Sequence, residues 1–180
     1  MGRVDEPGPR RRRGWYVPVG RVLGVPVGVS PGLLALAVAG ATAAVLAGGP
    51  WGRLLLVLAV VGGSLLAHEM AHAVVARLSG YRVDRVTLSL LGGLTAWWGP
   101  SPPPHVAVRI AAAGPATSAV LALAFVGLGT LAGGLDGILW VGAAVNLFDA
   151  LLNLLPLPAS DGRTIARALR RPGAAATTSG

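Results

Sequence analysis

Long apolar runs that contain few polar residues divide this chain into four segments. Two Gly-containing connections, "GGPWGR" and "AGGLDG", are short, whereas the connection between the second and third runs is longer and covers residues 79–105. A helix rises about 1.5 Å per residue, so each run can cross the roughly 30 Å of hydrocarbon in a bilayer. The pattern predicts an all-α integral membrane protein with about four transmembrane helices, over approximately residues 31–49, 54–78, 106–131 and 137–155.

The long connection contains a second kind of pattern. Its stretch "VTLSLLGGLTAWW", residues 86–98, is apolar and rich in β-branched and aromatic side chains on both sides of Gly92 and Gly93. Such a stretch is typical of two short strands joined by a glycine turn. We therefore expect a short membrane-associated β-hairpin between the second and third helices.

Composition agrees with a membrane protein. Hydrophobic residues make up 53% of the chain and charged residues 12%, whereas soluble domains carry about 25% charged residues. The absence of cysteine excludes a thiolate nucleophile or ligand. The formal net charge is +8, but the arginines gather at the two ends without interleaved aromatic residues. This favours a role in membrane topology, and we expect no nucleic-acid partner.

Arginine placement also predicts the orientation in the bilayer. Arg53 is the one arginine in the two short connections, and the termini and the long connection with its flanks hold the others. By the positive-inside rule, both termini and the long connection are cytoplasmic, which places Trp51 and Trp140 near the outer interface. We divide the chain into a basic cytoplasmic tail (1–20), a membrane core (21–171) and a flexible C-terminal tail (172–180).

The second run is interrupted by the motif "HEMAH", residues 68–72. On a helix, His68 and His72 lie one turn apart on the same face, so both can bind one zinc ion, while Glu69 lies beside them to accept a proton from water. Ionisable residues inside a bilayer cost about 2.5–3.5 kcal/mol each on insertion scales and are usually functional. The motif therefore predicts a metal site in the inner half of the membrane.

A catalytic zinc usually has three protein ligands, and three residues are candidates for the third. Asp161 follows "NLLPLPAS", in which two prolines must end the helix, so an irregular loop could carry it back toward the metal. We prefer Asp161, with Asp149 in reserve. His105 follows "SPPP" and is more simply explained as an interfacial loop residue.

Asp149 supports a separate hypothesis. With Asn146 and Asn153 it forms a polar face on the last apolar run. From there it could orient a zinc-binding histidine through a hydrogen bond. Alternatively, it could pair with an arginine such as Arg77 or Arg109, or stay protonated.

The two motifs together resemble the site-2 protease family of intramembrane zinc metalloproteases, peptidase family M50. The family's second motif has the form N-x-x-P-x-P-x-x-D-G, and this chain matches it at Asn153, Pro156, Pro158, Asp161 and Gly162. "GVPVGVSPG" before the first run, "LLGGL" and "AAAGPATS" are also similar to that family. The resemblance covers roughly residues 20–170. The chain departs from the family pattern at Ser118, Ser160 and Arg163.

The resemblance implies one Zn²⁺ per chain, held by His68, His72 and Asp161, with Glu69 as the general base. It also implies that Asn153 helps to hold the substrate or the transition state. In addition, it implies that the segment 86–98, which contains Gly92 and Gly93, pairs with an extended substrate; a simple interfacial hairpin is the alternative.

The function implied is hydrolysis of a peptide bond within or near a transmembrane segment of a membrane-protein substrate, as in regulated intramembrane proteolysis. We expect a multi-pass protein of a bacterial cell membrane. The alternative is a catalytically silent family member that acts as a membrane binding or regulatory protein. A metal transporter is disfavoured, because the outer halves of the runs are almost purely aliphatic.

Overall fold

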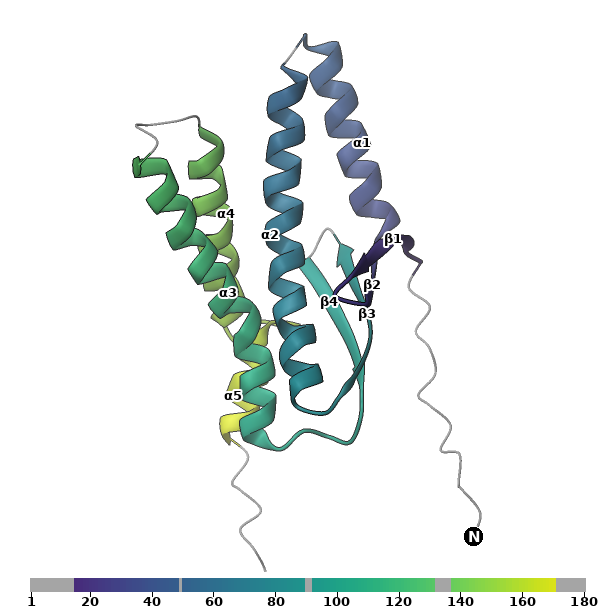
Figure 1. Cartoon of the computed structure of the whole chain (residues 1–180), viewed down its shortest axis with the longest axis vertical. Coiled ribbons are helices and arrows are strands. Elements are labelled where there is room, and N and C mark those ends of the chain that lie inside the picture. Colours follow the sequence, from purple (N-terminus) through teal and green to yellow (C-terminus); the bar gives the residue numbers. More distant parts are fainter. Residues whose placement is uncertain (1–14, 49, 90–91, 132–136, 171–180) are drawn as a thin grey trace, which may run out of the picture.

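The computed structural model describes residues 15–48, 50–89, 92–131 and 137–170. Most of the expected N-terminal tail (1–14) and the whole expected C-terminal tail (172–180) lie outside these residues. The described elements, in chain order, are β1 (Val17–Val22), β2 (Val25–Val29), α1 (Pro31–Leu46), α2 (Trp51–Leu78), β3 (Arg82–Ser89), β4 (Gly92–Trp98), α3 (Pro104–Leu131), α4 (Gly137–Leu154) and α5 (Asp161–Arg170) (Figure 1).

Three of the described helices, α2, α3 and α4, are long and apolar enough to cross a membrane. The fourth expected span, α1, is shorter at 16 residues. Large apolar side chains such as Leu36, Leu55, Leu123 and Leu151 are exposed on these helices. Apolar groups outside and polar groups inside are the arrangement expected where the surroundings are lipid. The chain is a membrane protein.

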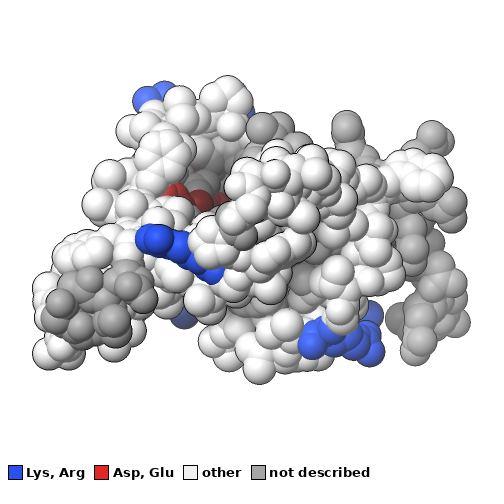
Figure 2. Space-filling model, turned by 90° about the horizontal axis from the view of Figure 1, so that it is seen from above, with Lys and Arg blue, Asp and Glu red and all other residues white. Residues whose placement is uncertain are grey.

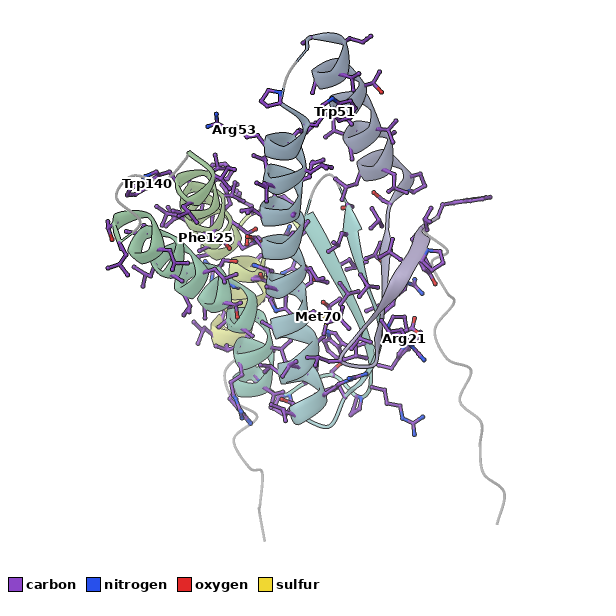
Figure 3. The ribbon with its side chains drawn as sticks, turned by 45° about the horizontal axis from the view of Figure 1, so that its top comes forward. Arg21, Trp51, Arg53, Met70, Phe125 and Trp140 are labelled. Carbon is purple, nitrogen blue, oxygen red and sulfur yellow. The ribbon has the colours of Figure 1, made fainter. Side chains whose placement is uncertain are left out.

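The helices form two antiparallel pairs, α1 with α2 and α3 with α4, and α2 contacts both α3 and α4 (Figure 1). Trp51 and Trp140 lie at the same end of the molecule, together with Arg53, whereas Arg21 lies toward the opposite end (Figure 3). The close α3–α4 contact depends on Gly142, because a Cβ there would press on the ring of Phe125.

A four-stranded sheet packs beside the C-terminal half of α2. Its order is β1-β2-β3-β4, with β2 and β3 parallel and the other neighbours antiparallel. Val25 of β2 and Val86 of β3 are completely buried in a cluster with Met70 and Ala73 of α2. The expectation of a helical protein with only a two-stranded hairpin was therefore incomplete. The first two strands were missed because prolines and glycines interrupt them, and because they gain a partner only when β2 pairs with the distant β3.

The expected hairpin is formed by β3 and β4, which pair antiparallel between α2 and α3 with Val86 opposite Thr95. The expectation that Gly92 and Gly93 form the turn of this hairpin was wrong. Gly92 and Gly93 are the first residues of β4, opposite Ser89 and Leu88, and the connecting residues 90–91 lie outside the described part of the chain. Gly92 has a φ of +115°, which favours glycine. Gly93 is required by its contact with Glu69, which is described with the candidate active site.

The proline-containing loop after α4 folds back tightly before α5 begins. The Ser160 hydroxyl lies 2.5 Å from the carbonyl oxygen of Leu155 and 2.9 Å from that of Leu157, and it accepts from the N–H of Arg163 (3.2 Å), so it caps α5. Gly162 is buried, and a Cβ there would collide with the Leu154 carbonyl. This tight return places Asp161 at the start of α5, facing α2.

Candidate active site

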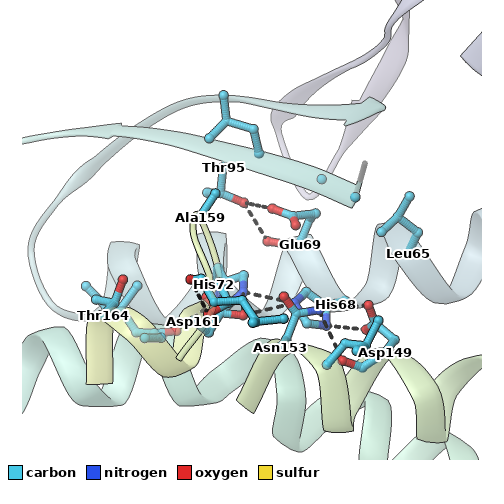
Figure 4. A pocket seen from close by; sticks show the side chains of 18 of the residues that line it. Leu65, His68, Glu69, His72, Thr95, Asp149, Asn153, Ala159, Asp161 and Thr164 are labelled. Carbon is cyan, nitrogen blue, oxygen red and sulfur yellow. Dashed lines mark hydrogen bonds and ion pairs between the residues drawn. The ribbon is translucent and has the colours of Figure 1, made fainter. Parts of the chain in front are cut away.

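Three residues form the centre of the site. Ligand atoms of His68, His72 and Asp161 all lie within 4.8 Å of one another. Asp161 Oδ2 lies 3.3 Å from His68 Nε2 and 3.2 Å from His72 Nε2, and the two Nε2 atoms are 3.2 Å apart. Figure 4 shows the three side chains converging from α2 and from the start of α5. Both histidines are buried, and Asp161 is half-buried.

The opposite nitrogen of each imidazole has its own partner. His72 Nδ1 lies 2.7 Å from the carbonyl of Ile110, an acceptor, so Nδ1 carries the proton and Nε2 has a free lone pair. His68 Nδ1 lies 2.6 Å from Asp149 Oδ2 and is a donor for the same reason. Two imidazole lone pairs and a carboxylate oxygen therefore face one point. This donor set fits a catalytic zinc ion.

In the metal-free site, burial raises the pKa of Asp161, but hydrogen bonds from the protonated forms of His68 and His72 outweigh this effect and leave the pKa below its ordinary value. The carboxylate is therefore ionised at neutral pH, as a metal ligand must be.

Asp149 lies behind His68 and is not in the three-residue cluster. Its Oδ2 also accepts from the Ser118 hydroxyl at 2.7 Å, and its Oδ1 accepts from Asn153 Nδ2 at 2.9 Å. The geometry fits the hypothesis that Asp149 orients a histidine. The alternative partner Arg77 instead donates to the carbonyl of Leu23.

The side-chain amide of Asn153 donates hydrogen bonds to the carboxylate and to the backbone carbonyl of Asp149. Asn153 also lines the cavity described below. His105 lies exposed in the first turn of α3, outside the group of described residues that could hold a metal.

Ser118 was noted in the sequence only as a departure from the family pattern. Its side chain is completely buried, and its hydroxyl lies 2.9 Å from His68 Nδ1 as well as 2.7 Å from Asp149. It comes one turn after the Gly-Pro pair of α3, and that spacing is the only local signal that could have pointed to it.

Gly114 of α3 allows the backbone to reach the histidines. A Cβ at this position would collide with Nε2 of both His68 and His72. Gly114 was noted in the sequence only as part of the stretch "AAAGPATS".

Glu69 faces β4. Its side chain is 5% exposed, and Oε2 accepts a hydrogen bond of 2.7 Å from the Thr95 hydroxyl. A Cβ at Gly93 would collide with the Glu69 carboxyl group. The close approach of strand to carboxylate explains why a strand position is occupied by glycine. Thr95 was missed, because nothing in its local pattern distinguishes it from a structural strand residue.

These groups line a cavity of about 880 Å³ bounded by α2, β4, α4 and the loop before α5. Gly92, Gly93 and Thr95 form part of one wall, and apolar side chains such as Leu65, Phe148 and Leu152 line other parts. Viewed from above, the surface is hollowed and acidic atoms are visible inside the hollow (Figure 2). The volume is within the range of ligand-binding pockets.

Fold and site together define a membrane-embedded helical protein with a His-His-Asp cluster suited to a metal ion and a glutamate beside it. Comparison with known proteins gives the family: the model of peptidase family M50 matches residues 56–134. The chain belongs to this family, which is also called the site-2 protease family.

Two curated relatives are similar in sequence. The Mycobacterium tuberculosis protein named "Putative zinc metalloprotease Rip3" is 50% identical over 111 residues, which cover 58% of this chain and 28% of that protein. The Synechocystis protein named "Putative zinc metalloprotease sll0528" is 36% identical over 160 residues, which cover 82% of this chain and 42% of that protein. The chain thus spans less than half the length of these relatives.

One solved structure shares the fold. The "Site-2 Protease from Methanocaldococcus jannaschii" matches with a TM-score of 0.73 and 19% identity, covering 86% of this chain and 71% of that one.

Proposed function

We propose that this chain is an intramembrane zinc metalloprotease that hydrolyses a peptide bond within or near a transmembrane segment of a membrane-protein substrate, as in regulated intramembrane proteolysis. One observation carries the proposal. The His68, His72 and Asp161 ligand atoms converge beside Glu69 on α2, a helix long and apolar enough to span a membrane. The relatives named as zinc metalloproteases favour zinc as the metal, with one ion per chain.

In this mechanism His68, His72 and Asp161 would hold the ion, and Asp149 and Ser118 keep His68 in the tautomer that presents Nε2. A zinc ion bound there would polarise the scissile carbonyl and lower the pKa of water. Glu69 accepts the proton of the attacking water and passes it to the leaving amine. Asn153, in the cavity wall beside Asp149, helps to hold the substrate or the transition state.

β4 is proposed to bind the substrate as an added strand. It is the last strand of the sheet, so one of its edges has no partner strand among the described elements. Its first residues, Gly92 and Gly93, line the cavity next to Glu69. A peptide bond inside a helix is shielded by the helix itself, so cleavage requires an extended substrate, and pairing with a strand edge supplies that conformation.

The arrangement in the membrane completes the proposal. We propose that α1 is a fourth span alongside α2, α3 and α4, and that both termini are cytoplasmic in a bacterial cell membrane. The division into a membrane core over 21–171 and tails over 1–20 and 172–180 is likewise proposed. The first strand begins before this division, at Val17.

The decisive test replaces Glu69 with Gln, which keeps the shape of the side chain and removes the base. We expect about one zinc per chain in both parent and variant. Cleavage should fall by at least about 10²-fold in the variant, because general-base catalysis typically contributes 10²–10⁴. Asp84→Asn makes the same chemical change on β3, in a residue paired with Arg85, and serves as the control.

Substrates can be found by comparing the membrane proteomes of cells that carry the parent or Glu69→Gln. A membrane protein that accumulates uncut only with the variant would support the proposal. Equal cleavage by both forms would show that Glu69 is not the base. A zinc-loaded parent that changes no membrane protein would favour the catalytically silent alternative.

A further inference from the structure

The hydroxyl of Thr95 lies between the sheet and the metal-site helix. Its oxygen is 2.7 Å from Glu69 Oε2 and 3.0 Å from the Glu69 backbone carbonyl oxygen (Figure 4). A threonine hydroxyl has one proton to donate, so it satisfies one of these acceptors at a time. The carboxylate oxygen is the nearer acceptor, and hydrogen bonds to ionised groups are the stronger kind.

A second observation concerns the same carboxylate. The position that a Cβ would take on Gly93 is occupied by Cγ, Cδ and Oε1 of Glu69. Gly93 and Thr95 are two residues apart on β4 and therefore face the same side of the strand. Thus Thr95 holds Oε2 by a hydrogen bond, and the bare backbone at Gly93 leaves the space in which Oε1 lies.

We propose that Thr95 is a positioning residue for Glu69, and that β4 thereby aligns the proton acceptor and the substrate on one element. The inference rests on the proposed function. With Oε2 held by the threonine, Oε1 is the oxygen left to accept the proton from water. A peptide that pairs with the free edge of β4 is placed in register with a carboxylate held by that same strand.

The test uses the full chain in phospholipid vesicles with a donor–quencher peptide that carries one transmembrane segment. Thr95→Val keeps the shape and removes the hydroxyl, and Thr95→Ser restores the hydroxyl. Thr87→Val is the matched control, since Thr87 is also half-buried, lies on the neighbouring strand opposite Leu94, and is not among the described residues that line the cavity.

We expect Thr95→Val to lower kcat by about 10-fold or more, with KM changed less than about twofold and zinc content unchanged, because a misplaced base slows proton transfer without weakening strand pairing. Thr95→Ser and Thr87→Val should cleave nearly as fast as the parent. A parental kcat in Thr95→Val would overturn the inference. It would equally be overturned if Thr95→Ser were as slow as Thr95→Val, or if the whole loss appeared in KM.

A second measurement does not depend on turnover. Thermal unfolding midpoints of the zinc-loaded parent, Thr95→Val, Glu69→Ala and the double variant form a double-mutant cycle. If Thr95 holds the carboxylate, the double variant loses less than the sum of the two single losses. Additive losses would overturn the inference. A zinc-loaded parent that does not cut the peptide but shows a non-additive cycle would count against the proposed function, while Thr95 would still position Glu69.

Discussion

Asp149 Oδ2 on α4 lies 2.6 Å from Nδ1 of His68 on α2, on the side of the imidazole opposite the nitrogen that faces Asp161. A carboxylate at this distance keeps the proton on Nδ1, fixes the ring orientation and makes the other nitrogen a better ligand. The same carboxylate is held by Ser118 from α3 and by Asn153 from its own helix. The orientation of one ligand therefore depends on contacts among three helices.

Replacing Asp149 with Asn should weaken zinc binding by about 10–100-fold, because the amide keeps the size of the side chain but loses the charge that holds the Nδ1 proton. Competition with a chromophoric chelator measures this affinity. Asp84→Asn on β3 is the control for the loss of one negative charge. Zinc affinity equal to that of the parent would show that Asp149 does not act on His68.

Replacing Gly114 with Ala should abolish zinc binding, since the added methyl group would occupy the space of both Nε2 atoms. Gly127→Ala is a matched control on the same helix, where a Cβ meets nothing within 4 Å. Both changes raise helix propensity by a similar amount, about 1 kcal/mol. A zinc content near one per chain in Gly114→Ala would mean that α3 moves away without harm to the site, contrary to our expectation.

Replacing Asp161 with Ala should remove the third ligand and lower zinc content, whereas Asp84→Ala should leave it unchanged. In the parent, removal of metal by a chelator should abolish cleavage, and added zinc should restore it. Metal analysis before and after dialysis provides the measurement. If Asp161→Ala kept both its zinc and its activity, another residue would have to complete the ligand set.

Single prolines along β4 should separate substrate pairing from metal binding. Backbone N–H groups of successive strand residues point alternately toward β3 and toward the free edge, and proline removes the N–H. Prolines at positions facing the free edge should therefore reduce cleavage while zinc content stays normal. Val19→Pro on β1, at the opposite edge of the same sheet, is the control. Undiminished cleavage at every position of β4 would exclude strand addition.

Much of the fold could be predicted from the sequence because it depends on local patterns. The apolar runs predicted α2, α3 and α4 to within about three residues at their ends, since a helix in lipid must be long enough and apolar enough to cross it. Helical spacing placed His68 and His72 on one face, and the proline-broken loop suggested how Asp161 could return to them. The structure brings these three residues together.

Other features were decided only by tertiary structure. The strands β1 and β2 acquire their place through β3, more than fifty residues away in the chain. The glycines at 92–93 satisfied the pattern of a turn, yet both lie in a strand. Position 93 is a glycine because Glu69 lies where a larger side chain would be. Small side chains and glycines carry no local signal that distinguishes packing from chemistry.

Helical spacing therefore determined which residues could meet a metal, and hydrophobicity determined which helices are long and apolar enough to span a membrane. The partners that orient them were decided by packing between distant segments. Thr95 on Glu69, Ser118 with Asp149 on His68, and Gly114 against both histidines each join two elements far apart in sequence. Such contacts depend on the distances and angles between packed helices and strands, which a local pattern of residue types does not contain.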